Sequence, residues 1–113
     1  MKTYQQSGRN TFLILNHKTV KKILVNDVIL LKGNINYTTF YLQYGGEKVV
    51  SHTIKFFEPF LEMHGFLRIH RGFMINPNFV MEYNNEQEYL TMSNGQKVNI
   101  SRRRKHTLND FVG

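Results

Sequence analysis

Short apolar segments separated by polar turns fill the first half of the chain. Segments rich in β-branched and aromatic residues, each closed by turn residues, are typical of β-strands. Such segments occupy residues 11–16, 20–25, 28–32, 37–44 and 48–51. Asn26-Asp27 separates the second segment from the third, and Gly45-Gly46 separates the fourth from the fifth. The pattern therefore predicts a meander of short strands with tight turns.

The spacing of apolar residues changes after Thr53. From there to His64 they recur at intervals of three and four residues, which indicates one amphipathic helix. Thr53 suits the N-cap position, and Gly65 suits termination in the left-handed conformation. Pro59 removes a backbone hydrogen bond from the interior of this helix, so we expect a kink or a loosened first turn.

Strand-like segments return in the second half, at residues 66–71, 79–83, 88–92 and 97–100. Asn94-Gly95 is the strongest hairpin signal in the chain. We expect Ser101 to cap a last helix that ends near Phe111.

Together the elements predict a mainly β fold of short strands, with one central amphipathic helix and a short C-terminal helix. Residues 1–10 are polar and are expected to form a tail outside a single domain of residues 11–113.

The composition is that of an ordinary globular protein and excludes several classes of site. The chain has 113 residues, 41% of them hydrophobic, which suits one core. It has no cysteine, so disulfides, thiolate metal sites and a cysteine nucleophile are excluded. The longest apolar runs, residues 12–15 and 28–31, are far too short for a membrane span, and the start lacks a signal peptide. We therefore expect a cytoplasmic protein.

The net charge favours a polyanionic partner. Fifteen Lys and Arg residues against eight Asp and Glu residues give +7, a balance that suits nucleic acid or an anionic surface. A solvated basic surface is the alternative reading of the same charge.

No spacing of residues points to catalysis or to a metal site. The five histidines and eight carboxylates form neither a His-x-x-x-His pair nor a His-Glu-x-x-His motif. The paired glycines Gly45-Gly46 lie in a hairpin rather than between a strand and a helix, so a phosphate-binding loop is absent. We expect neither an enzyme nor a bound cofactor.

The densest basic run, Arg102-Arg103-Arg104-Lys105, opens the expected last helix. Cations at a helix start oppose the helix dipole, and Arg104 stands where a capping box would have an acidic residue. A phosphate group at this position would use the free backbone N–H groups and the arginine side chains together. The alternative is a solvated charge run on a surface helix.

Two further segments carry polar side chains suited to nucleic acid. In residues 66–71, Arg68 and His70 are expected to point outward together, with Arg71 at the end of the strand. Residues 33–39 are expected to form a long, amide-rich connection between two strands, although ordinary loops have the same composition.

These residues together resemble a known family. The string FLRIHRGFMIN at residues 66–76 is followed by Asn94-Gly95 and then by ISRRR at residues 100–104. The combination of an F-x-R-x-H-R string with a later strand ending in S-R-R-R resembles the LytTR family of bacterial DNA-binding domains. The resemblance implies short strands in small, mostly antiparallel sheets and a role in transcription regulation. It also implies that loops, rather than a recognition helix, reach bases in successive major grooves.

The resemblance implies a role for each matching residue. Base contacts fall to Thr38, Arg71 and Arg103. Contacts to the DNA backbone, or support for the base contacts, fall to the remaining polar residues of the three segments: Asn36, Tyr37, Arg68, His70, Arg102, Arg104, Lys105 and His106.

The resemblance also bears on partners. It implies double-stranded DNA with tandem direct-repeat sites, and a second copy of the chain on that DNA. Family members commonly carry a receiver domain, which the sequence lacks, so we expect either a stand-alone protein with a separate signalling partner or a fragment.

Two other functions remain open from the residues alone. An RNA or single-strand binder would stack bases on Tyr37, Tyr41, Phe66 and Tyr89. A membrane-surface or protein-interaction module would need a basic amphipathic helix, whereas the expected helix carries Lys55 against Glu58 and Glu62.

Overall fold

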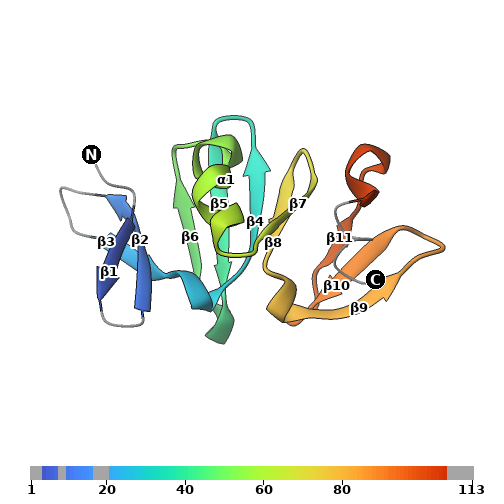
Figure 1. Cartoon of the computed structure of the whole chain (residues 1–113), viewed down its shortest axis with the longest axis horizontal. Coiled ribbons are helices and arrows are strands. Elements are labelled where there is room, and N and C mark those ends of the chain that lie inside the picture. The colour runs from blue at the N-terminus through green and yellow to red at the C-terminus, as the bar shows by residue number, and fades with distance from the viewer. Residues whose placement is uncertain (1–3, 8–9, 17–20, 107–113) are drawn as a thin grey trace.

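The computed structural model describes residues 4–7, 10–16 and 21–106 (Figure 1). The strands are β1 (Tyr4–Ser7), β2 (Asn10–Asn16), β3 (Lys21–Leu24), β4 (Val28–Asn34), β5 (Tyr37–Leu42), β6 (Glu47–Val50), β7 (Leu67–His70), β8 (Phe73–Ile75), β9 (Val80–Asn84), β10 (Tyr89–Met92) and β11 (Lys97–Asn99). The helices are α1 (Ile54–Met63) and four short 3₁₀ helices, η1 (Val25–Asp27), η2 (Gln43–Gly45), η3 (Pro77–Phe79) and η4 (Arg102–Arg104). All strand pairs are antiparallel, which confirms the mainly β fold expected from the sequence.

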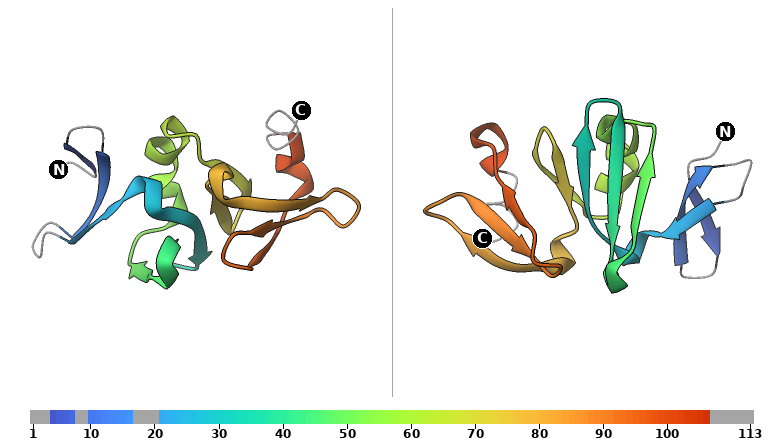
Figure 2. Two further views of the ribbon diagram at one scale, coloured as in Figure 1. Left: turned by 90° about the horizontal axis from the view of Figure 1, so that it is seen from below. Right: turned by 180° about the vertical axis from the view of Figure 1, so that it is seen from behind.

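The central sheet has five strands in the order β6-β5-β4-β8-β7. Helix α1 covers one face of this sheet, as the two opposite views show (Figures 1 and 2). A three-stranded sheet of β1, β2 and β3 flanks it on one side, and another of β9, β10 and β11 on the other. The resulting molecule is elongated, with extents of 45 × 31 × 25 Å.

Two hydrophobic cores share strand β4. The first core lies under α1 and contains Leu13, Ile23, Val25, Val28, Leu31, Phe40, Ile54, Phe57, Leu61, Phe66 and Met74. The second packs against the C-terminal sheet and contains Ile29, Leu30, Ile69, Ile75, Leu90, Met92, Val98 and Ile100. Strict alternation would place Val28 and Leu30 on the same face, but the pairing of β4 with β5 shifts register between them. Alternation gives β4 a residue in each core, and the shift explains why Val28 and Leu30 belong to different ones.

The expectation of a polar tail at residues 1–10 is wrong for the part of this segment that the structure describes. Tyr4–Ser7 is strand β1 and pairs with β2, with Tyr4 opposite Leu13. The Tyr4 ring stacks on Phe60 of α1, with ring centroids 4.8 Å apart. The sequence YQQS has no apolar alternation, so this strand depends on its partners rather than on its own pattern.

Two other differences from the expected strands concern the central sheet. The expected meander is divided, because η1 joins β3 to β4 and these two strands lie in different sheets. Strand β8, which the sequence does not predict, lies between β4 and β7. Its buried residues Met74 and Ile75 belong to different cores, and three residues are too few to show an alternating pattern.

The ends of α1 match the expected positions but only partly the expected chemistry. Thr53 occupies the N-cap position, yet its side chain makes no capping hydrogen bond. The helix continues through Pro59 to Met63. Gly65, with φ of +87°, terminates it in the left-handed conformation, as the sequence predicts.

Candidate nucleic-acid interface

Three surface segments from different parts of the sequence lie along one edge of the molecule, the upper edge in Figure 1. They are the β4–β5 turn (residues 34–37), the β7–β8 turn (residues 71–72) and the start of η4 (residues 101–104). We refer to these residues together as the basic edge. Backbone hydrogen bonds join its parts: Gly33 N–H donates to the Gly72 carbonyl (2.9 Å), and Ser101 N–H donates to the Ile69 carbonyl (2.9 Å).

The β4–β5 turn is a tight hairpin and not the long connection expected at residues 33–39. The strands run to Asn34 and from Tyr37, which leaves two residues between them. One of these, Ile35, has φ of +53° and is 88% exposed. Asn36 and Tyr37 are also exposed, so the tip presents both amide and aromatic side chains.

A residue that contacts DNA must be exposed on the basic edge, and Thr38 is not. Its side chain is fully buried, and its Oγ1 donates a hydrogen bond to the His52 carbonyl at 2.6 Å. The structure therefore gives no support to the base contact expected at Thr38, because its side chain does not reach the surface. The bond joins β5 to the segment before α1, a long-range contact that local sequence does not show.

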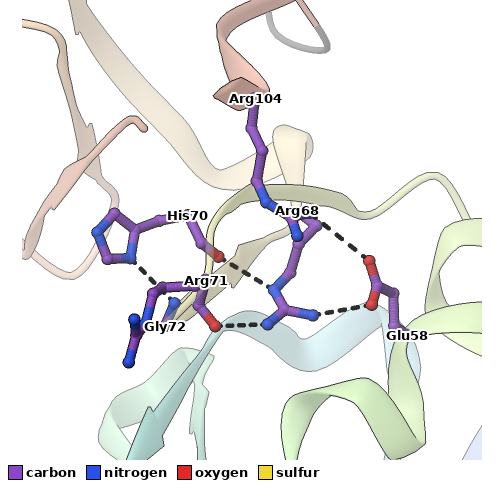
Figure 3. A network of polar contacts seen from close by, with 6 residues as sticks. All are labelled: Glu58, Arg68, His70, Arg71, Gly72 and Arg104. Carbon is purple, nitrogen blue, oxygen red and sulfur yellow. Dashed lines mark hydrogen bonds and ion pairs between the residues drawn. The ribbon is translucent and has the colours of Figure 1, made fainter. Parts of the chain in front are cut away.

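The β7–β8 turn is held from inside by its own neighbours (Figure 3). His70 Nδ1 accepts a hydrogen bond from Gly72 N–H at 2.9 Å. The Arg68 guanidinium donates to the carbonyl of His70 through Nε (3.0 Å) and to the carbonyl of Arg71 through Nη2. Arg71 itself is exposed, and Figure 3 shows its guanidinium pointing away from these contacts.

Arg68 is a structural member of this turn rather than the outward-pointing cation expected from the sequence. Its side chain is only 13% exposed and forms an ion pair with Glu58 of α1, Nη1 to Oε1, at 2.8 Å. Burial lowers the pKa of the Arg68 guanidinium, and the Glu58 carboxylate opposes that shift. Strand alternation does place Arg68 opposite Ile69, but that face of the sheet is covered by α1.

The η4 segment presents its arginines unequally. Arg102 and Arg103 are exposed, and no side-chain partner for either lies among the described residues. Arg104 Nη1 lies 3.8 Å from Glu58 Oε2, and Lys105 Nζ lies 3.3 Å from Glu88 Oε1. His106 is exposed.

Ser101 begins η4 but does not cap it with its side chain. It holds the N-cap position without a capping hydrogen bond, and its buried Oγ has no partner among the described residues. The expected C-terminal helix begins as a 3₁₀ turn, and its predicted end near Phe111 lies outside the described residues.

An open hollow of about 220 Å³ lies between the first two turns of the basic edge. Its lining includes Asn34, Tyr37, Thr53, Lys55 and Arg71. Lys55 is exposed there and adds a cation that the sequence pattern did not assign to nucleic acid. Its place on the edge follows from the way α1 starts beside Gly33, where a Cβ atom would come 3.0 Å from Ile54 Cδ1.

The aromatic residues considered for single-strand binding do not form a common surface. Tyr37 is 53% exposed, but Phe66 is buried in the first core. Tyr41 packs against the second core, and Tyr89 is half-buried beneath the Lys97 ammonium. A stacking platform would need several exposed rings side by side.

Other kinds of site find no support in the part of the chain that the structure describes. It holds no group of three or more metal-ligating side chains of the His, Cys, Asp or Glu type. Nor does any helix within these ranges have the length and apolar character needed to cross a membrane.

The residues of the basic edge lie in a stretch that matches a known family. The model of the LytTr DNA-binding domain matches residues 18–113. The chain belongs to this family. The LytTR resemblance seen in the sequence is thereby confirmed. No curated protein matches the chain.

The LytTR fold is also found in a solved structure. The chain is similar to the LytTr DNA-binding domain of a Bacillus cereus protein described as a methyl-accepting/DNA response regulator. The TM-score is 0.72 at 19% identity, and the match covers 100% of this chain and 99% of that one. The family assigns this LytTR domain to DNA binding, and the solved structure shows the same fold.

Proposed function

We propose that this LytTR domain reads specific sequences in double-stranded DNA through its basic edge, with the turns entering successive major grooves. The observation that carries the proposal is the alignment of three surface segments along one edge, joined through neighbouring residues by backbone hydrogen bonds. The net charge of +7 supports binding to a polyanion.

The dimensions of the molecule suit this mode of binding. Its longest extent is 45 Å, and one turn of B-DNA measures about 34 to 36 Å along its axis. The three segments project from the edge as turns. Helix α1 packs its buried residues against the central sheet and does not project as a recognition helix would.

Arg71 and Arg103 are the residues proposed to read bases. Both are exposed, and neither has a side-chain partner among the described residues, so their guanidinium groups are available to guanine O6 and N7. At the β4–β5 turn the role expected for Thr38 passes to Asn36. Asn36 is exposed at the tip, and asparagine can form two hydrogen bonds with adenine. Tyr37 lies beside it.

Contacts to the DNA backbone are proposed for the exposed cations beside these positions: Lys55, Arg102 and His106. Arg104 and Lys105 are partly exposed and share their charge with carboxylates, so they contribute less. Arg68 and His70 support the β7–β8 turn from within. This division revises the backbone roles expected from the sequence.

Measurement of affinity on preferred and random DNA tests this proposal. The preferred sequence is first selected from random duplexes. Arg71→Ala and Arg103→Ala should each cost about 1 to 3 kcal/mol on the preferred duplex and much less on a random one. Lys48→Ala is the matched control, because Lys48 is an exposed cation on β6, away from the basic edge. Equal losses on both duplexes for the two arginine variants would contradict the base-reading role.

We also propose that the DNA sites are tandem direct repeats, each occupied by one copy of the chain. The LytTR resemblance supports this arrangement. The number of chains bound to duplexes with one repeat and with two repeats tests it, and a single chain on the two-repeat duplex would contradict it.

A further inference from the structure

One carboxylate contacts arginines from two different segments of the basic edge. Glu58 Oε1 lies 2.8 Å from Arg68 Nη1, and Glu58 Oε2 lies 3.8 Å from Arg104 Nη1 (Figure 3). Arg68 holds the carbonyls of the β7–β8 turn, whereas Arg104 belongs to η4. Glu58 itself lies on α1, so one helix position is tied to both segments.

The burial of this cluster favours a fixed geometry. The side chains of Glu58 and Arg68 are 21% and 13% exposed, so water screens their attraction less than it would at the surface. Arg104, at 37%, is the more open partner. Loss of the carboxylate would leave two guanidinium groups near each other, with the more buried one unpaired.

Each arginine of the cluster stands close in the chain to a proposed base-reading residue. Arg68 bonds the backbone carbonyl of Arg71, and Arg104 directly follows Arg103. The position of Glu58 therefore affects the backbone from which both base-reading side chains extend. Small displacements of such side chains are enough to lose paired hydrogen bonds to a base.

We infer that Glu58 is a positioning residue for DNA recognition, which fixes the spacing between Arg71 and Arg103 by holding Arg68 and Arg104 on separate carboxylate oxygens. The inference rests on the proposed function. Glu58 carries a negative charge and faces the two arginines, so no contact with DNA is assigned to it. Its effect is on sequence preference rather than on attraction to the polyanion.

The test compares Glu58→Gln with Glu82→Gln on preferred and random duplexes. Both substitutions remove one negative charge, so they change the general attraction to DNA in the same direction. Glu82 is exposed on β9 and forms no ion pair within the described residues. We expect Glu58→Gln to lower the ratio of preferred to random affinity about tenfold relative to Glu82→Gln, a typical size for coupling between contacting charged residues. Equal ratios for the two variants would overturn the inference.

A second measurement separates positioning from folding and from the proposed function. Amide hydrogen exchange without DNA should show faster exchange at Ser101 N–H in Glu58→Gln, with the core strands unchanged. If Arg71→Ala and Arg103→Ala leave the ratio of preferred to random duplex affinity unchanged, the base-reading proposal fails. The exchange at Ser101 then decides the positioning role alone, and unchanged exchange would overturn it.

Should Glu58→Gln fail to fold, Glu58→Asp replaces it in both measurements. Aspartate keeps the charge but is one methylene shorter, so it cannot reach both arginines as glutamate does. The ratio of preferred to random affinity should then fall by less than tenfold but stay below that of Glu82→Gln. A ratio equal to that of Glu82→Gln would count against the inference.

Discussion

Two turns of the basic edge lie side by side and are built in different ways. Gly33 N–H, at the base of the β4–β5 turn, bonds the Gly72 carbonyl of the β7–β8 turn at 2.9 Å. The β4–β5 turn depends on its backbone, with Ile35 at φ of +53° and its side chains exposed. The β7–β8 turn is held instead by side-chain bonds from Arg68 and His70.

The difference indicates how each turn can meet DNA. The β7–β8 turn is preorganised, so Arg71 starts from a fixed backbone and can be selective at low entropic cost. The β4–β5 turn has fewer side-chain constraints and can adjust its tip to the groove. Substitutions in the two turns should therefore differ in their effects on the free energy of unfolding and on affinity for DNA.

The largest expected effect follows from removing the ion pair beneath the β7–β8 turn. Arg68→Met should lower the free energy of unfolding by about 2 kcal/mol, because it leaves Glu58 partly buried without its nearest cation. Urea unfolding measures the change. Arg71→Met is the control in the same turn and should change stability by less than about 0.5 kcal/mol, since Arg71 is exposed. Similar losses for both would show that the two arginines are not divided into support and recognition.

A smaller effect of opposite sign is expected in the β4–β5 turn. A β-branched residue is strained at positive φ, so Ile35→Gly should raise the free energy of unfolding by about 0.5 to 1 kcal/mol. The same change should weaken binding to the preferred duplex, because Ile35 is exposed at the tip, where its apolar side chain can meet a thymine methyl group. Thermal unfolding and duplex affinity check the two parts. A stabilised variant with unchanged affinity would remove Ile35 from the interface.

The smallest expected effect concerns the acidic side of the Glu58 cluster. Burial and then the neighbouring Glu58 raise the pKa of Glu62 above its ordinary value of 4.5. A raised pKa in the folded state means that the fold favours the protonated carboxyl. This contribution therefore adds stability as the pH falls through the raised pKa, and it is lost as the pH rises again.

Comparison with Glu62→Gln isolates this contribution from the other carboxylates. Relative to the variant, the native chain should gain a little stability between about pH 7 and about pH 4. Thermal unfolding across that range measures the difference. Parallel pH profiles for the two proteins would show that Glu62 is not coupled to the cluster.

The sequence predicted those strands and helices that have a clear apolar periodicity, and it predicted the exposed arginines of the basic edge. Alternation identified most strands, the three- and four-residue spacing identified α1, and the LytTR motif identified Arg71 and Arg103, which the structure leaves exposed. Elements without a pattern of their own, β1 and β8, were not predicted. Their strand pairing is a tertiary effect.

The errors at the candidate interface have one physical cause. Alternation shows that Arg68 and Ile69 lie on opposite faces, but it does not show that both faces are covered. In the same way, Thr38 is polar and close to a turn, yet it is buried, and the carbonyl of His52, from another part of the chain, accepts its hydrogen bond. Local pattern gives the side of a strand on which a residue lies, and only the packed neighbours decide whether that side is solvent.

Strand β4 also has a consequence for cooperativity. Because its adjacent residues Leu30 and Leu31 belong to different cores, neither core can open while β4 stays fully packed. The two cores should therefore melt together in one transition, although they lie on opposite faces of a sheet. A substitution such as Leu31→Ala, made in the first core, should loosen the C-terminal sheet as well, and with it the anchorage of η4.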